Sequence, residues 1–338
     1  MHKEVVVKLV IDNHHYNSIL RQLPKEGYKD FRFFIGNEID CDAAIVFDYA
    51  QKDIELNCNP NNVWLWNMEP PDEEWEWLRK GYKHYQKVIT VDHSINHSKL
   101  IKNQLAIPWQ INKTYDELTA SNFFEEKKKT LSFITSNYAA RRGHRKRLKF
   151  LDQIKDKVDF DLWGRGFRTM EDKFDALHDY KYSIVIENSR HRDYWSEKVA
   201  DALLAGCLPF YYGCPNISNY FHPQSLIQID IEKPNEAISI IRKAIENKEW
   251  EKRQQNIEQE RQKIVNEYQF FPVFIKLFQQ FGSFNGNRQR ITIPMLSFHP
   301  SEIKPLSLSR NFYLLKKTIF KNRYLDPESP SFGFTTYK

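Results

Sequence analysis

Residues 180–213, YKYSIVIENSRHRDYWSEKVADALLAGCLPFYYG, decide the fold of this chain. The apolar, β-branched run Tyr182–Ile186 predicts a buried strand, and Leu208–Tyr212 predicts a second one. Between them Ser196 can cap a helix that Gly206 would end, because serine suits the N-cap and glycine the position after the last turn. Strand, helix and strand together predict a βαβ unit of a parallel sheet.

The predicted helix begins where open α/β sheets bind phosphate groups, beyond the carboxyl end of a strand. Lys198 falls in its first turn, where a cation is unfavourable against the helix dipole unless an anion is bound nearby. We therefore expect a bound phosphate at this turn.

The polar residues of the block also resemble a family signature. The segments Ile186-Glu187-Asn188-Ser189, Asp193-Tyr194-Trp195-Ser196-Glu197-Lys198, and Asp201 to Pro209 followed by Tyr212-Gly213 resemble the donor-binding signature of the α1,3-fucosyltransferases, glycosyltransferase family 10, in a bacterial-type member. The likeness extends more weakly from about residue 60 to about residue 235. The alternative interpretation is an ordinary buried βαβ unit without a ligand.

Composition limits the class of protein. The chain has 338 residues, 14% of them aromatic, and only 11 glycines, which excludes disorder and fibrous repeats. It contains no run of eighteen apolar residues, and its charged start does not resemble a signal peptide. The four cysteines lack metal-site spacing and are expected to be reduced, as in a cytoplasmic protein.

The net charge of +6 permits an anionic ligand or membrane surface without requiring a nucleic acid. The dense basic cluster at 141–147 is short, so we expect no nucleic-acid partner. A nucleic-acid binder that uses this cluster is the alternative from another class.

Two series of β-rich runs predict two domains. The first series lies before residue 112 and the second after residue 130, with helix-like stretches between the strands. We expect an N-terminal, acceptor-side Rossmann-like domain (1–112), a polar linker (113–129), a nucleotide-sugar-binding domain (130–285) and a basic, aromatic tail (286–338). Two such domains facing a central cleft form the α/β architecture called GT-B, which the family resemblance also implies.

The resemblance implies which residues hold the donor. Ser136 and Asn137 end a predicted strand, and the Gly143–Arg147 segment opens the next helix, so a second strand-to-helix corner can hold phosphate. An arginine fork binds two phosphate oxygens; Arg145 matches the family best, and Arg147 is the alternative. The remaining implied donor contacts are Glu187, Asn188, Tyr194 and Lys198. Glu197 is expected near the transferred sugar or the ribose, although it also suits the first turn as a helix-stabilising acid.

Glu69 is the expected catalytic base. It follows the aromatic run Trp64–Trp66 and precedes Pro70 and Pro71, and it resembles the glutamate of the Met/Phe-Glu-Ser-Pro segment of animal fucosyltransferases. A carboxylate among tryptophans is partly desolvated, so its pKa rises and it becomes a better base. The alternative is a turn residue before two prolines.

Together with these residues, the family resemblance implies an inverting transferase of L-fucose from GDP-β-L-fucose to an oligosaccharide or lipid-linked glycan. By family analogy the acceptor is an N-acetyllactosamine-type unit or part of a lipopolysaccharide or capsule. No cofactor is expected, and no metal ion either: Asp40-x-Asp42 and Asp159-x-Asp161 have the Asp-x-Asp form, but this short motif is weak. Another nucleotide sugar, or a silent binding module, is the alternative.

The tail segment 304–325 mixes basic and aromatic residues, which suits peripheral contact with an anionic inner membrane. A helix packed on the protein's own surface is the alternative.

Overall fold

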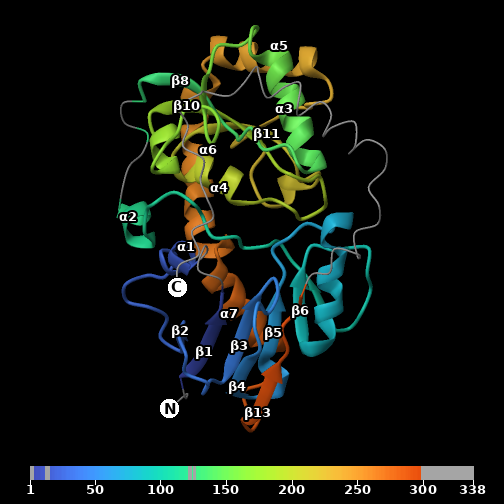
Figure 1. The fold of residues 1–338 in the computed structure, drawn as a ribbon. Coiled ribbons are helices and arrows are strands. Elements are labelled where there is room, and N and C mark those ends of the chain that lie inside the picture. Colours follow the sequence, from blue (N-terminus) through green and yellow to red (C-terminus); the bar gives the residue numbers. More distant parts are fainter. Residues whose placement is uncertain (1–3, 12–15, 121–123, 125–126, 298–338) are drawn as a thin grey trace.

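The computed structural model of the protein describes residues 4–11, 16–120, 124 and 127–297. The expected tail segment 304–325 lies outside the described residues. Within the described residues the chain forms two α/β domains, one above the other in Figure 1.

The lower domain is built on a six-stranded parallel sheet in the order β2-β1-β3-β5-β6-β7. Its central strands are apolar on both faces, because helices or a second sheet layer cover each face. The strands are β1 (Val5–Val10), β2 (Phe31–Phe34), β3 (Ala43–Phe47), β5 (Val63–Trp66), β6 (Lys87–Thr90) and β7 (Leu100–Lys102). The helical segments are α1 (Tyr16–Leu20), η1 (Pro60–Asn62) and η2 (Glu73–His84), the last with 3₁₀ geometry.

The upper domain contains a five-stranded parallel sheet in the order β12-β11-β10-β8-β9. Its strands are β8 (Lys129–Ile134), β9 (Asp161–Trp163), β10 (Tyr180–Ile186), β11 (Leu208–Tyr212) and β12 (Ile227–Gln228). Its helices are α3 (Arg142–Ile154), α4 (Glu197–Leu204), α5 (Pro234–Glu246) and α6 (Glu249–Lys263), with short turns η3 (Lys173–Ala176) and η4 (Ile217–Asn219). The predicted βαβ unit is therefore confirmed as β10, α4 and β11.

The strand order of the upper sheet reverses between β8 and β10. From β8 the chain passes through α3 to β9 on one side, and from β10 it passes through α4 to β11 on the other. Helix α3 packs with α5 and α4 packs with α6. Ligands of open α/β sheets bind at such a reversal, beyond the carboxyl ends of the strands. The starts of α3 and α4 both lie there.

The last described elements return to the lower domain. A π-helical turn (Ile264–Tyr268) follows α6, and α7 (Phe270–Phe281) then packs its phenylalanines into the lower core (Figure 1). Strand β13 (Gln289–Ile293) pairs antiparallel with β4 (Ile54–Cys58). The expected boundary at residue 285 places α7 in the upper domain. The structure differs, because the apolar face of α7 is buried against the lower sheet.

The expected linker is also partly structured. Trp109, Ile111 and Leu118 are buried in the core of the upper domain, and α2 (Tyr115–Ala120) carries the last of them. The expected end of the N-terminal domain at residue 112 therefore lies too far along the chain, because Trp109 and Ile111 already pack in the upper core.

Several contacts join the two domains. Asp72 of the lower domain pairs with His191 at 2.8 Å, and His93 pairs with Asp193 at 2.6 Å. Tyr194 is buried against Val91 and Leu105. The loop between β10 and α4 thus forms much of the domain interface.

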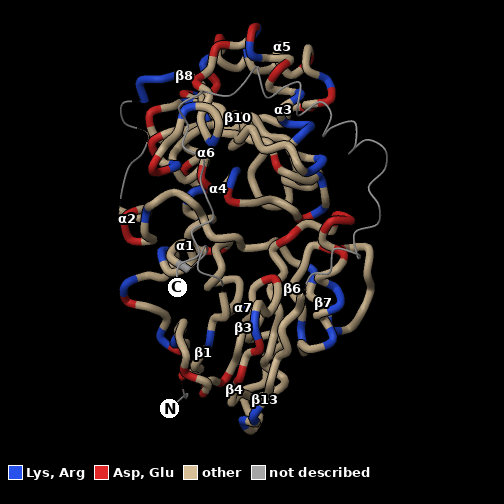
Figure 2. The backbone as a smooth tube through the Cα atoms, viewed as in Figure 1, with Lys and Arg blue, Asp and Glu red and all other residues tan. Residues whose placement is uncertain are grey.

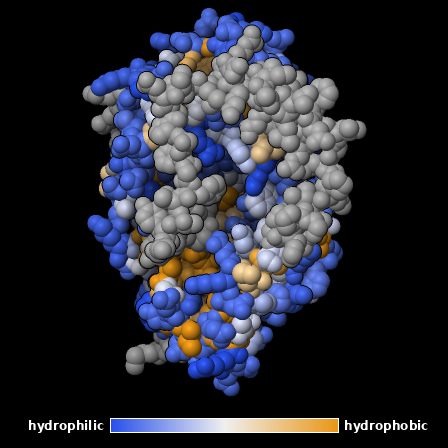
Figure 3. All heavy atoms as spheres, in the orientation of Figure 1, coloured by the Kyte–Doolittle hydropathy of each residue, from blue (hydrophilic) through white to orange (hydrophobic). Residues whose placement is uncertain are grey.

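In the view of Figure 2, Lys and Arg positions are interspersed with Asp and Glu positions over both domains. Figure 3 shows a largely hydrophilic face, with hydrophobic residues gathered on the lower domain. Among the described residues no helix is both long and apolar enough to cross a membrane.

Helix α7 should carry much of the stability of the lower domain. Phe274 is fully buried and packs on Phe31, Phe33 and Trp64. We expect Phe274→Ala to lower the free energy of unfolding by about 3–5 kcal/mol in urea titrations. The substitution leaves a cavity, and the aromatic rings around it cannot move far enough to fill it. The control Phe281→Ala removes a side chain that is 38% exposed and should cost much less. Equal losses for both variants would contradict the packing of α7.

Candidate active site

The site begins at the first turn of α4. Ser196 is the N-cap, and its hydroxyl accepts a hydrogen bond from the backbone N–H of Lys198, as the sequence predicts. The hydroxyl also donates to Glu187 Oε2 at 2.6 Å, and the Ser196 N–H donates to Glu187 Oε1 at 2.9 Å. Gly206 has φ +74°, a left-handed conformation that suits glycine after the helix end. The end of β10 and the start of α4 are thus tied together by one buried carboxylate.

Lys198 lies between two carboxylates. Its Nζ is 3.0 Å from Glu197 Oε1 and 3.8 Å from Glu187 Oε2. Burial alone would lower the pKa of Lys198, but Glu197 and Glu187 raise it above its usual value. Burial would likewise raise the pKa of Glu197, and Lys198 with Lys173 lowers it to about 2. Both groups are therefore charged at neutral pH.

This pairing corrects one step of the sequence argument. We expected Lys198 to require a bound anion because it opposes the helix dipole. The carboxylates of Glu187 and Glu197 already compensate its charge, so its position by itself does not require a ligand.

Helix α3 approaches this cluster closely. A Cβ on Gly143 would lie 1.7 Å from the carbonyl oxygen of Asn188, so only glycine allows the helix to begin there. Arg147, one turn further, donates to Asn188 Oδ1 at 3.0 Å. Burial lowers the pKa of Arg147, which the nearby carboxylates of Glu187 and Glu197 partly offset.

Arg145 and Arg147 occupy different places. Arg145 donates to the carbonyls of Ala139 at 3.3 Å and Ala140 at 2.7 Å, over the loop before α3. Arg147 lies on the buried face of the helix, and its Nε is buried without a hydrogen-bond partner among the described residues. The structure therefore brings Arg147 together with Lys198 and leaves Arg145 at the loop.

His144 is a residue that sequence reasoning missed. Burial and the positive charges of Arg147 and Arg141 lower the pKa of His144 to about 4, so the imidazole is neutral at pH 7. Its Nδ1 is buried and has no partner within the described part of the chain. The signal in the sequence was only its i−3 spacing from Arg147, which places both on one helix face.

The other expected donor residues are Ser136, Asn137, Asn188 and Tyr194, and they lie on different segments of the upper domain. Ser136 and Asn137 follow β8, and the Asn137 N–H donates to the carbonyl of Arg165 at 3.0 Å. Neither forms a hydrogen bond with Lys198 among the described residues. Tyr194 is buried, and its pKa is raised well above the usual value by burial and then by the carboxylates of Glu187 and Glu197. Tyr194 and Asn188 therefore lie at the cluster, whereas the contact of Asn137 is with the loop at Arg165.

Glu69 reaches the same cluster from the lower domain. It follows β5, and its N–H donates to Asn67 Oδ1 at 3.0 Å. Burial, and then the charge of Asp48, raises the pKa of Glu69 to about 8, while Arg141 and Lys198 act in the opposite direction. Glu69 and Lys198 thus interact electrostatically although they come from different domains.

Asp48 is a second residue that the sequence did not indicate. It follows β3 with φ +57°, a left-handed conformation that is strained for residues other than glycine. Its Oδ1 accepts a hydrogen bond from the Met68 N–H at 2.6 Å, directly before Glu69. The strained turn therefore holds a negative charge beside the expected base.

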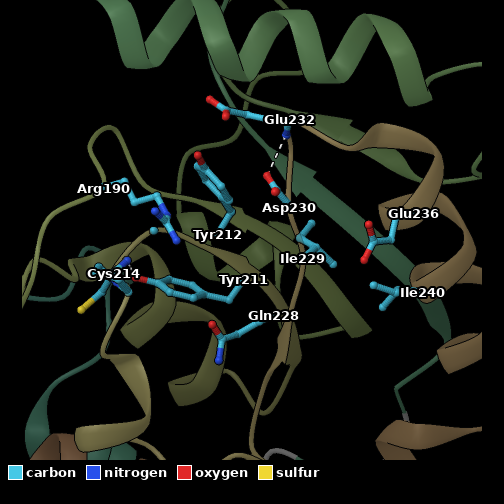
Figure 4. Close-up of a pocket in the computed structure, with 12 residues that line it drawn as sticks. Arg190, Tyr211, Tyr212, Cys214, Gln228, Ile229, Asp230, Glu232, Glu236 and Ile240 are labelled. Atoms are coloured by element: carbon cyan, nitrogen blue, oxygen red, sulfur yellow. Dashed lines mark hydrogen bonds between the residues drawn. The ribbon is translucent and has the colours of Figure 1, made fainter.

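Two cavities lie at the carboxyl ends of the sheets. One, of about 530 Å³, is bordered by Glu69, Asp48 and aromatic side chains of the lower domain. The other, of about 340 Å³, lies beside β11 and β12 (Figure 4). Arg190, Asp230, Glu232 and Glu236 line it, and Asp230 accepts from the Glu232 N–H at 2.9 Å. Its acidic lining makes it a poor site for a diphosphate.

No three His, Cys, Asp or Glu side chains within the described residues converge on a common metal position. Three of the four acids of the Asp-x-Asp motifs have other partners: Asp40 accepts from Asn57, Asp42 pairs with Arg288 and Asp161 accepts from Tyr180.

Comparison with known proteins gives a match to one family over part of the chain. Residues 124–253 match the model of glycosyltransferase family 10 (fucosyltransferase), C-terminal part. Over these residues the chain is similar to glycosyltransferase family 10. The matched range contains β8 to α5 and the starts of α3 and α4, so it includes the charge cluster around Lys198.

Curated relatives agree with the family assignment. The human 4-galactosyl-N-acetylglucosaminide 3-alpha-L-fucosyltransferase 9 is 25% identical over 190 residues, which cover 53% of this chain and 51% of that protein. The alpha-(1,3)-fucosyltransferase FucT of Helicobacter pylori is 31% identical over 74 residues, 22% of this chain and 16% of that protein. The chain spans about half the length of the first of these relatives.

Solved structures titled alpha1,3-fucosyltransferase also align with the chain. The structure with GDP has a TM-score of 0.48 at 14% identity, covering 78% of this chain and 90% of that one. The structure with GDP-fucose has a TM-score of 0.43 at 14% identity, covering 96% and 94%. Two parallel sheets with facing carboxyl ends give this chain the GT-B fold.

The raised pKa of Glu69 predicts a pH-dependent stability. The pKa is about 8 in the folded protein and 4.5 without the fold, so the stabilisation from neutral Glu69 is complete below pH 4.5 and disappears as pH rises through 8. We expect Glu69→Gln to gain thermal stability relative to the wild type as pH rises from 5 to 9, measured as the difference in Tm. Asp48→Asn should move this transition to lower pH. If the Tm difference between Glu69→Gln and the wild type stayed constant from pH 5 to 9, the raised pKa of Glu69 would be contradicted.

Arg147 and Arg145 should differ in their effect on a diphosphate ligand. We expect Arg147→Gln to weaken GDP binding in calorimetry by at least tenfold, because Arg147 lies with Lys198, and Arg145→Gln to weaken it less. The reverse order would assign the diphosphate to the loop before α3.

Proposed function

We propose that this chain is a member of glycosyltransferase family 10, an inverting fucosyltransferase that moves L-fucose from GDP-β-L-fucose to a hydroxyl of an acceptor glycan. The match of residues 124–253 to the family model and the printed activities of the relatives support fucosyl transfer. The single observation that carries the mechanism is the domain interface, where Asp72 pairs with His191 at 2.8 Å and His93 pairs with Asp193 at 2.6 Å. These contacts bring the segment after β5, which carries Glu69, to the loop that leads into α4 and Lys198.

In the proposed reaction Glu69 takes the proton from the acceptor hydroxyl. The oxygen attacks C1 of fucose from the face opposite the diphosphate, the new O–C1 bond forms, and the bond from C1 to the β-phosphate oxygen breaks. GDP leaves with the bonding electrons, and the β-linked donor gives an α-linked product. One carboxylate suffices, because a nucleoside diphosphate leaves without protonation.

The charge that develops on the β-phosphate needs cations nearby. We assign this role to Lys198 and Arg147, with Arg145 at the loop side, because the first two lie together. Ionised Glu197 can only accept hydrogen bonds, so it suits sugar or ribose hydroxyls rather than acid catalysis. Ser136, Asn137, Glu187, Asn188 and Tyr194 complete the proposed donor site.

We also propose that transfer needs no metal ion, since two cations and two helix N-termini already surround the leaving group. The acceptor is proposed to carry an N-acetyllactosamine-type unit, the acceptor in the printed name of the human relative. Presentation on a lipid at the inner membrane, by a peripheral cytoplasmic protein, remains part of the proposal.

Nucleotide preference and transfer together test this function. In buffer with EDTA we expect GDP, but not UDP or CMP, to raise Tm, and GDP-fucose to be hydrolysed and transferred to N-acetyllactosamine. Glu69→Gln should reduce transfer by about 10²–10⁴-fold while GDP still raises Tm.

The control is Glu73→Gln, which changes an exposed acid at the start of η2 and should leave transfer unchanged. Stabilisation by UDP alone would assign another nucleotide sugar. Binding without hydrolysis or transfer would favour a silent binding module. Full transfer by Glu69→Gln would exclude Glu69 as the base, and transfer that EDTA abolishes and Mg²⁺ restores would contradict the metal-free mechanism.

A further inference from the structure

Helix α4 carries a second buried acid one turn after Glu197. Asp201 follows Glu197 by four residues, a spacing that places both side chains on one face of the helix. Asp201 is fully buried, and a buried carboxylate stays charged only beside a cation. Lys173, the first residue of η3, provides that cation: its Nζ lies 2.6 Å from Asp201 Oδ2, and only 16% of the lysine side chain is exposed. A buried lysine therefore lies one helical turn from Glu197.

The protein fixes Lys173 in this place from both sides. Asp201, its partner, is itself held, because Asp201 Oδ1 accepts a hydrogen bond from the Gln110 N–H at 2.9 Å. Asp172, the N-cap of η3, accepts from the Asn112 N–H at 2.9 Å. All of these contacts are formed by the protein alone, so the position of the lysine is pre-organised.

The charge of Lys173 also acts on Glu197. Burial would raise the pKa of Glu197, and the charges of Lys198 and then Lys173 lower it to about 2. Other charged groups also face Glu197, and the buried phenol of Tyr194 faces it too. These charged groups are Asp201 on its own helix, Glu187 after β10, Arg147 on α3 and Glu69 of the lower domain.

Two of the three cations near Glu197 have another task in the proposed reaction. Lys198 and Arg147 are assigned to the diphosphate, whereas Lys173 pairs with a carboxylate of the protein. Once a donor is bound, Lys173 is therefore the cation that serves Glu197. An ionised carboxylate forms stronger hydrogen bonds to hydroxyl groups than a neutral one does.

We propose that Lys173 is a positioning residue of the donor site, which keeps Glu197 ionised and turned toward the hydroxyls of the nucleotide sugar. The inference rests on the proposed function. Lys173 acts through Glu197 and does not contact the reacting atoms. Its pair with Asp201 fixes the lysine at the correct distance along α4.

Steady-state kinetics between pH 5 and pH 8 test this role. In the wild type we expect the KM for GDP-fucose to change less than about twofold over this range, because Glu197 stays ionised. Lys173→Gln removes the charge and keeps a hydrogen-bond donor. We expect it to raise this KM at least about fivefold as the pH falls from 8 to 5, because Glu197 then takes up a proton. At saturating donor kcat should change much less, and Lys173→Arg should restore the wild-type profile.

A double-mutant cycle separates positioning from a general structural effect. In Glu197→Gln the side chain carries no charge, so adding Lys173→Gln should change the KM for GDP-fucose by less than about twofold. The matched control is Lys181→Gln. Lys181 pairs with Glu251 at 2.7 Å elsewhere in the upper domain, and its loss should leave the donor KM and its pH profile unchanged.

Three results would overturn the positioning role. The first is a wild-type donor KM that rises at low pH as a carboxylate titrates, and this result requires no variant to fold. The second is a Lys173→Gln profile identical to that of the wild type. The third is an equal rise of the donor KM from Lys173→Gln with and without Glu197→Gln. A wild type that neither binds GDP nor transfers fucose would instead refute the proposed function.

Discussion

The ion pairs of Lys198 with Glu187 and Glu197 are the interaction on which the rest of the site depends. Glu187 directly follows β10 and accepts hydrogen bonds from the N–H and the hydroxyl of Ser196. The same carboxylate therefore compensates the charge of Lys198 and fixes the N-cap of α4. Removing one member would leave an uncompensated charge in a buried place, which costs more than the pair itself contributes. The family signature can thus be understood as a structural unit and a ligand site at once.

The loop between β10 and α4 also contacts the lower domain, so the position of the charge cluster is fixed relative to that domain. The loop between β10 and α4 provides His191, Asp193 and Tyr194 to the interface, and α7 returns the chain to the lower core. Because both ends of the upper domain are anchored in this way, Glu69 lies within electrostatic range of Lys198. The proposed reaction needs this arrangement, with the proposed base on one domain and the proposed cations on the other.

Local features of the fold could be predicted from the sequence and non-local ones could not. The cap at Ser196, the stop at Gly206 and the helix Arg142–Ile154 depend on neighbouring residues, and the structure has all three. Helix α7 packs on the lower sheet, and Trp109 already packs in the upper core. Both contacts depend on tertiary packing between distant segments, which the periodicity of the sequence does not encode. The pairing of Lys198 with Glu187 could not be predicted, because Glu187 lies on another element. The left-handed turn at Asp48 could not be predicted either, because aspartate rarely adopts this backbone conformation.

A crystal structure with GDP-fucose is the most direct test of the central claim, that a diphosphate lies between the starts of α3 and α4 and turns the sugar toward Glu69. We expect β-phosphate oxygens within hydrogen-bond distance of Lys198 Nζ and Arg147, with C1 of fucose open to the side of Glu69. A diphosphate bound elsewhere, such as the acidic cavity at Asp230, or a fucose that faces away from Glu69 would contradict the account.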